Sequence, residues 1–188
     1  AIFGRAVPRR GNAHIMGASA PCEVYPCKGG GSNDHVLVYT SRAGNHQWHN
    51  LLKLMGREDL GDDPRFATPQ LRFQHSAVID PLIREWTLTR DKYTCMRELG
   101  EAGVPASAVI DTMELYEDPV LRAQGAFVTV EHPVRGPFTM PGCPVRMSDS
   151  PIASTAAPLL GADNARVWGG MLGLSAEQLA ALRADRAI

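Results

Sequence analysis

The sequence predicts a mixed α+β fold, in which a small α+β domain is followed by a carboxy-terminal helical segment. Two short runs rich in Val and Tyr stand on either side of a turn-forming run near the beginning of the chain. Three segments follow in which apolar residues recur at every third or fourth position, the spacing of one helical face. The 188 residues are 44% apolar and 21% charged, a composition that can bury a core and is too poor in charge for disorder.

The first elements expected are a linker and a β-hairpin. Residues 1–20 show no periodicity and are interrupted by Gly and Pro, which predicts an irregular loop. Glu23–Pro26 and Val36–Thr40 have the composition of strands, and the Gly-rich run Cys27–Asp34 between them is typical of a turn.

Three helices are expected next. In the first, Gly56 is a suitable end for an apolar face made of Trp48, Leu51, Leu52 and Met55. The second has a stripe of Val78, Ile79, Leu82, Ile83 and Trp86, and Pro81 either kinks it or opens a fresh helix after an Asp80 cap. Thr89 or Asp91 can cap the third, which buries Cys95, Leu99 and Ala102 and ends at Gly103-Val104-Pro105.

The carboxy-terminal part predicts two strands and one helix. The strand candidates are Phe127–Val130 and Val145–Met147, and the pairs His132-Pro133 and Gly136-Pro137 between them are typical of turns. A last helix is expected from about Ala176 to Arg183. Its start fits a capping box of Ser175 and Gln178, with Leu174 and Leu179 placed to form a hydrophobic staple.

Charge and cysteine content favour a small-molecule partner. The formal net charge is -1 and the basic residues are scattered, so neither nucleic acid nor a membrane surface is an expected partner. The four cysteines are too few for a disulfide framework, and no signal peptide or long apolar run is present. We therefore expect a reduced, cytoplasmic protein. Because the chain begins Ala1-Ile2-Phe3 without an initiator Met, we also expect a fragment.

Several residue patterns could suggest a site, but each has a plainer interpretation. His46 and His49 are spaced for one face of a helix, yet no third metal ligand is evident, so no metal site is expected. Cys22 and Cys27 fit neither a zinc knuckle nor a redox pair.

Two further patterns are interpreted as loops. Lys28-Gly29-Gly30-Gly31-Ser32 contains the residues of a phosphate loop in the wrong order, which favours a hairpin turn. The carboxylate-rich stretch Gly56–Arg65 is typical of a solvated connection between helices. No nucleophile elbow, kinase signature or dinucleotide fingerprint is present.

A series of segments, in order along almost the whole chain, resembles the class III CoA-transferases, the formyl-CoA transferase family. The series is Arg10-Gly11-Asn12, Tyr25–Gly29, Trp48–Leu60, Asp63-Pro64-Arg65, Ala102–Ala106, Asp118-Pro119, Gly125, His132-Pro133 and Ala157–Gly161. Each segment alone is weak evidence for the family, and the resemblance depends on finding all of them in the same order as in the family.

The resemblance implies an α/β protein in two parts. On this template residues 1–20 are a linker, 21–130 the small α+β domain, 131–150 a connecting segment, and 151–188 a return to a Rossmann-like large domain. It also implies two subunits interlocked like chain links.

The implied reaction moves coenzyme A, a substrate and not a permanently bound cofactor, from an acyl-CoA thioester to a small carboxylic acid. The family's nucleophile is an Asp of an amino-terminal half that this chain lacks. The resemblance therefore implies no catalytic residue in this chain, which is expected to be inactive when isolated.

The family resemblance assigns one part of the active site to this chain. In the family a glycine-rich loop after the Arg-Gly-Asn segment shields the reacting aspartate. The matching residues here are His14, Ile15, Met16 and Gly17, of which only Gly17 keeps the expected type. A second departure is Gly161–Asn164, where family members commonly have Gly-Glu-His-Thr; helix capping by Asp163 or Asn164 is expected there.

Two alternatives remain at this stage. One is the 2-methylacyl-CoA racemase branch, which uses a similar fold. The other is a non-catalytic module or assembly partner that pairs with a separate amino-terminal chain.

Overall fold

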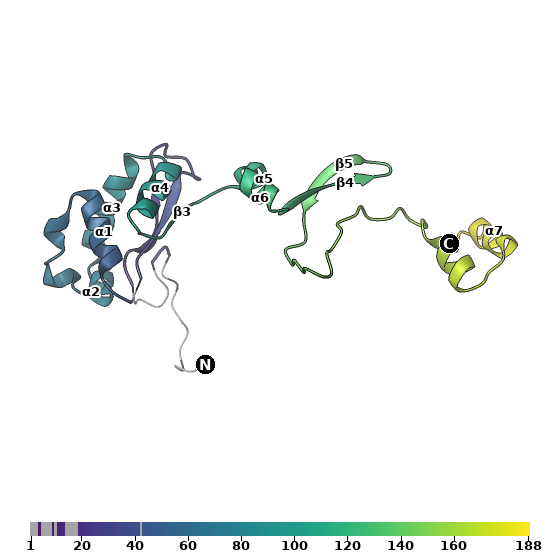
Figure 1. Cartoon of the computed structure of the whole chain (residues 1–188), viewed down its shortest axis with the longest axis horizontal. Coiled ribbons are helices and arrows are strands. Elements are labelled where there is room, and N and C mark those ends of the chain that lie inside the picture. Colours follow the sequence, from purple (N-terminus) through teal and green to yellow (C-terminus); the bar gives the residue numbers. More distant parts are fainter. Residues whose placement is uncertain (1–3, 5–8, 10, 14–18, 42) are drawn as a thin grey trace. The chain divides into compact units, whose positions relative to one another are not determined.

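The computed structural model describes residues 4, 9, 11–13, 19–41 and 43–188. It divides into two compact units, Ala1–Asp111 and Thr112–Ile188 (Figure 1). Both contain helices and strands, so the mixed α+β class predicted from the sequence is confirmed. None of the helices in the described residues is both long and apolar enough to cross a membrane.

The first unit is built on a three-stranded antiparallel sheet in the order β1-β2-β3. The predicted hairpin forms from β1 (Cys22–Pro26) and β2 (His35–Tyr39), with Cys22 opposite Tyr39. The third strand, β3 (Ala106–Ala108), pairs with β2 and was not predicted. Three small residues carry no alternating apolar pattern, so only pairing with β2 defines this strand.

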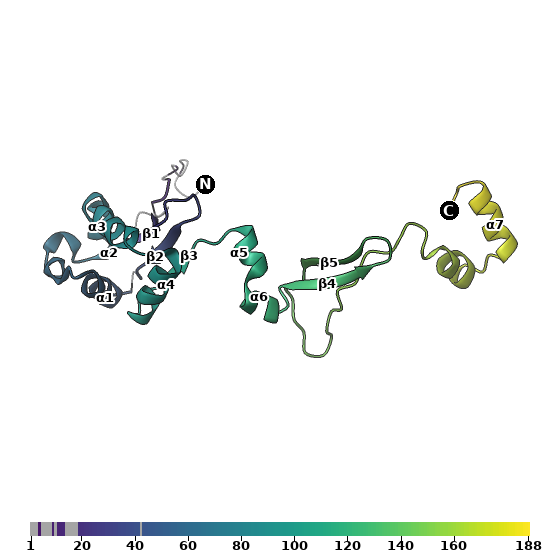
Figure 2. The same ribbon diagram turned by 90° about the horizontal axis from the view of Figure 1, so that it is seen from above.

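Helices and short helical turns pack against the sheet of the first unit (Figure 2). The elements are α1 (His46–Met55), η1 (Glu58–Leu60), η2 (Pro64–Phe66), α2 (Pro69–Gln74), α3 (Ser76–Leu88) and α4 (Lys92–Glu101). Helix α3 contacts β1, and α4 contacts β2 and β3. These packed faces enclose the core.

The three predicted helices are confirmed, and the structure shows where α1 ends, where Pro81 lies in α3 and which residue caps α4. Gly56 ends α1 with a φ of 67°, in the left-handed region that glycine adopts without strain. Pro81 lies inside the single helix α3. Asp91 caps α4, because its carboxylate accepts from the backbone N–H groups of Tyr93 at 3.1 Å and Thr94 at 3.0 Å.

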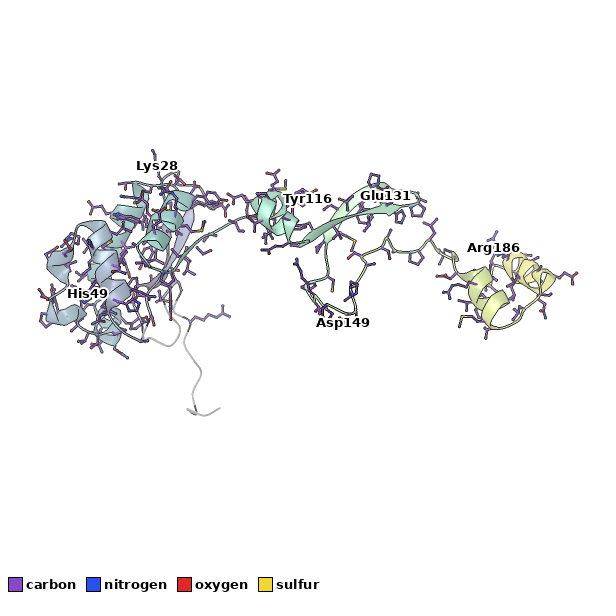
Figure 3. All side chains as sticks on the ribbon, in the orientation of Figure 1. Lys28, His49, Tyr116, Glu131, Asp149 and Arg186 are labelled. Carbon is purple, nitrogen blue, oxygen red and sulfur yellow. The ribbon has the colours of Figure 1, made fainter. Side chains whose placement is uncertain are left out.

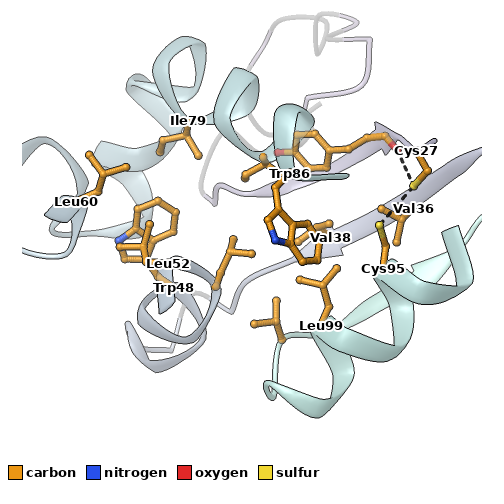
Figure 4. Packing of buried hydrophobic residues seen from close by; sticks show 14 of the residues in the cluster. Cys27, Val36, Val38, Trp48, Leu52, Leu60, Ile79, Trp86, Cys95 and Leu99 are labelled. Atoms are coloured by element: carbon orange, nitrogen blue, oxygen red, sulfur yellow. Dashed lines mark hydrogen bonds between the residues drawn. The ribbon is translucent and has the colours of Figure 1, made fainter. Parts of the chain in front are cut away.

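The core of the first unit joins residues from the sheet and from all three long helices (Figure 4). Trp48 packs edge-on against Phe66, with ring centroids 6.0 Å apart. Each large side chain buried here contributes about 1.5–3 kcal/mol relative to exposure. The buried cluster is Tyr25, Cys27, Val36, Val38, Trp48, Leu51, Leu52, Leu60, Phe66, Ile79, Ile83, Trp86, Cys95, Leu99 and Val104.

The second unit begins with α5 (Thr112–Glu117) and α6 (Pro119–Ala123), followed by an antiparallel pair, β4 (Phe127–His132) and β5 (Gly136–Pro141). The prediction for the second strand was wrong. Gly136-Pro137 begins β5 and is not a turn, while Val145–Met147 lies outside every helix and strand.

The physical reason is the position of the prolines. Pro137 and Pro141 are an even number of residues apart, so the missing N–H groups lie on the same side of β5. A two-stranded sheet leaves one side of each strand unpaired, where proline is tolerated. The turn is instead closed by His132, whose Nδ1 accepts from the N–H groups of Val134 at 3.2 Å and Arg135 at 3.1 Å.

The end of the chain contains a π-helical segment, η3 (Ala165–Met171), and α7 (Ala176–Ala184). The predicted capping box is present: Ser175 Oγ accepts from Gln178 N at 3.2 Å, and Gln178 Oε1 accepts from Ser175 N at 2.8 Å. The predicted cap at Asp163 or Asn164 was wrong. Asn164 occupies the N-cap position of η3, but its side chain makes no cap bond there, and the Asp163 carboxylate instead accepts from Arg166 Nε at 3.0 Å.

The division between the two units lies after Asp111, whereas the boundary expected after residue 130 falls within β4. The units are defined by contacts within this chain alone. The assignment of 21–130, 131–150 and 151–188 to domains of a longer protein therefore stays a prediction.

Candidate functional site

The segment that the sequence analysis singled out contains His14, Ile15, Met16 and Gly17, which lie outside the described residues. The residues on both sides of it are described. They attach the chain to the first unit at two places, which we call the upstream anchor, at Asn12, and the downstream anchor, at residues 19–21.

The upstream anchor is formed by one side-chain amide. Asn12 Nδ2 donates to the carbonyl of Val24 at 2.7 Å, and the N–H of Val24 donates to Asn12 Oδ1 at 3.0 Å. Asn12 thus pairs with β1 as the backbone of a neighbouring strand would, on the free edge of the sheet. Gly11 precedes it with a φ of 61°, which favours glycine.

The downstream anchor is buried. Ser19 Oγ donates to the carbonyl of Thr40 at 2.8 Å, and the N–H of Thr40 donates to the carbonyl of Pro21 at 2.9 Å. Ser19, Ala20 and Thr40 are each no more than 2% exposed. The chain therefore enters β1 along a path set by the residue that follows β2.

Arg72 of α2 completes the downstream anchor. Its Nε donates to the carbonyl of Ala20 at 2.9 Å, and its Nη1 donates to Asn45 Oδ1 at 3.0 Å and to the carbonyl of Phe66 at 2.9 Å. The guanidinium also lies over the Trp48 ring, with its carbon 5.2 Å from the centroid. One buried side chain thus ties together the chain before β1, the start of α1, and η2.

The charge on Arg72 is unusual for its surroundings. The side chain is fully buried, its hydrogen-bond acceptors are neutral, and its Nη2 has no partner in the part of the chain that the structure describes. Desolvation by burial lowers the pKa of Arg72 to about 10. Burying a charge and an unpartnered N–H group raises the free energy of the folded state. We therefore interpret Arg72 as a residue that holds the surrounding segments in position.

A second polar cluster lies beside the upstream anchor. The Tyr25 hydroxyl donates to Asp80 Oδ1 of α3 at 2.8 Å, which links β1 to that helix. Burial raises the pKa of the Asp80 carboxyl, against the opposing effect of the tyrosine hydrogen bond. Burial and the nearby Asp80 charge raise the pKa of Glu23, whose Oε2 is 3.4 Å from Asn12 Nδ2.

Arg72 and the Tyr25–Asp80 pair were not predicted from the sequence. No short motif contains both partners of either contact, because Arg72 and Ala20 are 52 residues apart and Tyr25 and Asp80 are 55 residues apart. An arginine in a helix with apolar neighbours is ordinary in sequence, and no local signal marks it as buried. Asp80 drew notice only as a possible helix cap.

The other patterns considered in the sequence do not assemble into sites. His46 and His49 are exposed on α1 (His49 is labelled in Figure 3), and the described residues contain no group of three or more His, Cys, Asp or Glu that could hold a metal. In the Gly-rich turn, Asp34 Oδ2 accepts from Gly31 N at 2.8 Å, so a carboxylate occupies the position that a phosphate would need. This agrees with a hairpin turn.

The carboxylates of the Gly56–Arg65 stretch are paired with arginines. Asp59 and Asp63 receive bonds from Arg57 and Arg65, with closest approaches of 2.9 and 2.7 Å. These bonds lower the pKa of both carboxyls, the opposite of what a general acid needs. The stretch fits its interpretation as a solvated connection.

Comparison with known proteins identifies the family. The family model described as CoA-transferase family III matches residues 1–164. The chain belongs to this family. The resemblance inferred from the sequence is therefore confirmed, and the anchors described above are features of a family III chain.

Curated relatives of this family III chain are named formyl-CoA:oxalate CoA-transferase. One from Streptomyces avermitilis is 40% identical over 186 residues, covering 99% of this chain and 44% of the relative. Another from Escherichia coli O157:H7 is 35% identical over the same length. The chain thus spans less than half the length of these relatives and corresponds to their carboxy-terminal part.

Solved structures agree on the fold. The crystal structure of a CaiB/BaiF family protein from Brucella suis matches with a TM-score of 0.72 and 24% identity, covering 90% of this chain and 42% of that one. Rv3272 from Mycobacterium tuberculosis matches with a TM-score of 0.65 and 18% identity over 80% of this chain and 40% of that one.

Proposed function

We propose that this chain is the carboxy-terminal part of an acyl-CoA:carboxylate CoA-transferase. The complete protein would transfer coenzyme A from an acyl-CoA thioester to a small carboxylic acid. Coenzyme A would be a substrate, and no permanently bound cofactor is proposed. The observation that carries this proposal is the match to the family III model together with curated relatives that bear a transferase name.

The nucleophile of the reaction is proposed to be an Asp in the amino-terminal part that this chain does not span. In the described residues, the carboxyls whose pKa is lowered are already engaged: Asp59 and Asp63 pair with arginines and Asp91 caps α4. Asp80 is half-buried and bonded to Tyr25, and its raised pKa disfavours the ionised nucleophile. We therefore assign no catalytic residue here.

The contribution proposed for this chain is residues 14–17, which would shield the acylated aspartate from water. A mixed anhydride hydrolyses readily, so excluding water favours transfer to the acceptor acid. The upstream and downstream anchors support this role, because they attach both flanks of the segment to the first unit through Asn12, Ser19 and Arg72. The proposed enzyme is cytoplasmic and an interlocked homodimer.

The test compares the complete protein, this 188-residue chain, and a mixture of the chain with its separately expressed amino-terminal part. Each is assayed for CoA transfer from formyl-CoA to oxalate and to a panel of other short carboxylic acids. Transfer is expected with the complete protein and none with the chain alone. Turnover by the pure chain would contradict the assignment of the nucleophile.

The mixture separates the proposal from its alternatives. Restored transfer would mean that the chain completes an active site. Stable association without transfer to any acid, together with an inactive complete protein, would instead indicate a non-catalytic module. Racemisation of a 2-methylacyl-CoA by the complete protein, without transfer, would replace the transferase proposal.

A further inference from the structure

Two thiols meet in the core where the hairpin packs against α4. Cys27 follows β1 and Cys95 lies in α4, and their Sγ atoms are 3.8 Å apart although 68 residues separate them in the sequence (Figure 4). Both side chains are fully buried. The cysteines are free thiols in this structure.

Hydrogen bonds on both sides of Cys27 hold the end of β1 against the segment that leads into α4. Before this cysteine, Thr87 Oγ1 donates to the carbonyl of Pro26 at 2.7 Å. After it, the N–H of Lys28 donates to the carbonyl of Arg90 at 2.7 Å. Because Thr87 lies at the end of α3 and Arg90 between α3 and α4, these bonds hold the turn after β1 close to the start of α4, where Cys95 lies.

The two thiols are in hydrogen-bond contact. The Cys27 thiol donates to Cys95 Sγ, and the Cys95 thiol donates to the carbonyl of Thr87 at 3.8 Å. In a disulfide the sulfurs are about 2.05 Å apart, so each would move by roughly 1 Å.

We propose that Cys27 and Cys95 form an oxidation site that closes to an intrachain disulfide, with hydrogen peroxide as the oxidant. The thiolate of one cysteine attacks a peroxide oxygen, the O–O bond breaks, and a sulfenic acid forms while hydroxide leaves. The sulfur of the other cysteine attacks the sulfenic sulfur, and the S–S bond forms as the hydroxyl leaves with that thiol's proton as water. The first thiol's proton converts the hydroxide to water, so one peroxide yields two waters.

The reaction is expected to be slow. Burial raises the pKa of both thiols, that of Cys95 to about 12, so little thiolate is present at neutral pH. The half-buried Cys22 and Cys143 are more accessible and are expected to react first. The disulfide, once formed, would stabilise the first unit because it closes a long loop in the unfolded chain.

The test uses a Cys22→Ser/Cys143→Ser variant of the 188-residue chain, in which only the buried pair remains. The protein is incubated with hydrogen peroxide, denatured, alkylated without reduction, digested, and analysed by mass spectrometry. We expect the peptides of Cys27 and Cys95 to be joined and unalkylated. We also expect the melting temperature to rise by on the order of 10 °C and to return on reduction with dithiothreitol.

The matched control adds Cys27→Ser, which leaves a single buried thiol and should show no rise in melting temperature. If the variants do not fold, the same peptide mapping on the unsubstituted chain shows whether the Cys27 and Cys95 peptides are joined. The proposal fails if Cys27 and Cys95 are still recovered as alkylated thiols, or as separate sulfinic acids, after an incubation that continues well beyond the complete oxidation of Cys22 and Cys143 in the unsubstituted chain. It also fails if the cross-link forms only between two molecules.

Discussion

At the scale of residues, the first unit places a buried arginine, Arg72, and a half-buried carboxyl, Asp80, against neutral partners. Burial disfavours the charged form of a group, so it raises the pKa of the acid Asp80 and lowers that of the base Arg72. Asp80 keeps one compensating bond, from the Tyr25 hydroxyl. Each of these groups therefore links the protonation state of the protein to its stability.

The raised pKa of Asp80 predicts how Asp80→Asn changes stability with pH. Above the ordinary carboxyl pKa of about 4 the unfolded state releases this proton first, so the native state binds more protons and its stability falls as pH rises. An asparagine can still accept from Tyr25 and carries no charge. We expect the variant to gain stability relative to the unsubstituted chain as the pH rises from 4 to 7.

Urea unfolding at several pH values measures this difference. Tyr25→Phe is the matched control, because it removes the bond that lowers the Asp80 pKa and should steepen the loss of stability with pH. If the free energies of unfolding of Asp80→Asn and the unsubstituted chain differed by the same amount at every pH, the raised pKa of Asp80 would be contradicted.

At the scale of elements, caps and anchors decide where each segment begins. Asp91 starts α4, and the Ser175–Gln178 box starts α7. These signals act over three residues and are readable in sequence. Arg72 acts differently, since it connects α1, η2 and the chain leading into β1.

We predict that Arg72→Met destabilises the chain by about 2–4 kcal/mol, because the carbonyls of Ala20 and Phe66 and the Asn45 amide oxygen lose their donor. Removing the buried charge offsets part of this loss. Arg72→Lys should destabilise the chain less than Arg72→Met, since the lysine ammonium can still donate hydrogen bonds to these acceptors. Unfolding in urea, followed by circular dichroism, measures the change.

The matched control is Arg84→Met on the exposed side of α3, which should change stability by no more than about 0.5 kcal/mol. Equal effects at positions 72 and 84 would show that Arg72 does not hold the three segments together.

At the scale of the whole molecule, the second unit exposes many large apolar side chains. Val134 is 76% exposed, Met171 70% and Val120 61%. Large exposed apolar surface in a soluble domain usually marks a contact site. Since the chain spans 44% of the length of its Streptomyces avermitilis relative, we propose that the complete protein covers part of this surface.

We predict that amide hydrogen exchange in residues 143–172 is slower in the complete protein than in the 188-residue chain, because packing against the additional residues protects them. Exchange in α1, whose core residues are already buried, should be the same in both and serves as the internal control. Equal exchange in residues 143–172 would mean that these residues remain uncovered.

Short-range patterns were sufficient for much of the fold. The helices α1, α3, α4 and α7 and the capping box were predicted, because each depends on neighbours within about four residues. The hairpin of β1 and β2 was predicted from the composition of its two strands and of the Gly-rich turn between them. The sequence also identified the family, since ordered segments along the chain carried that resemblance. The catalytic role of residues 14–17 remains a prediction.

Tertiary structure decided what depends on distant partners. Strand β3 forms because its backbone pairs with β2. Strand β5 tolerates two prolines because no strand pairs with its outer side. Arg72, the Tyr25–Asp80 bond and the Cys27–Cys95 pair join residues 52 to 68 positions apart. The sequence by itself determined the family and the elements that depend on neighbouring residues. Only the tertiary structure brought these distant side chains together, because their contacts depend on three-dimensional packing and produce no periodic pattern in the sequence.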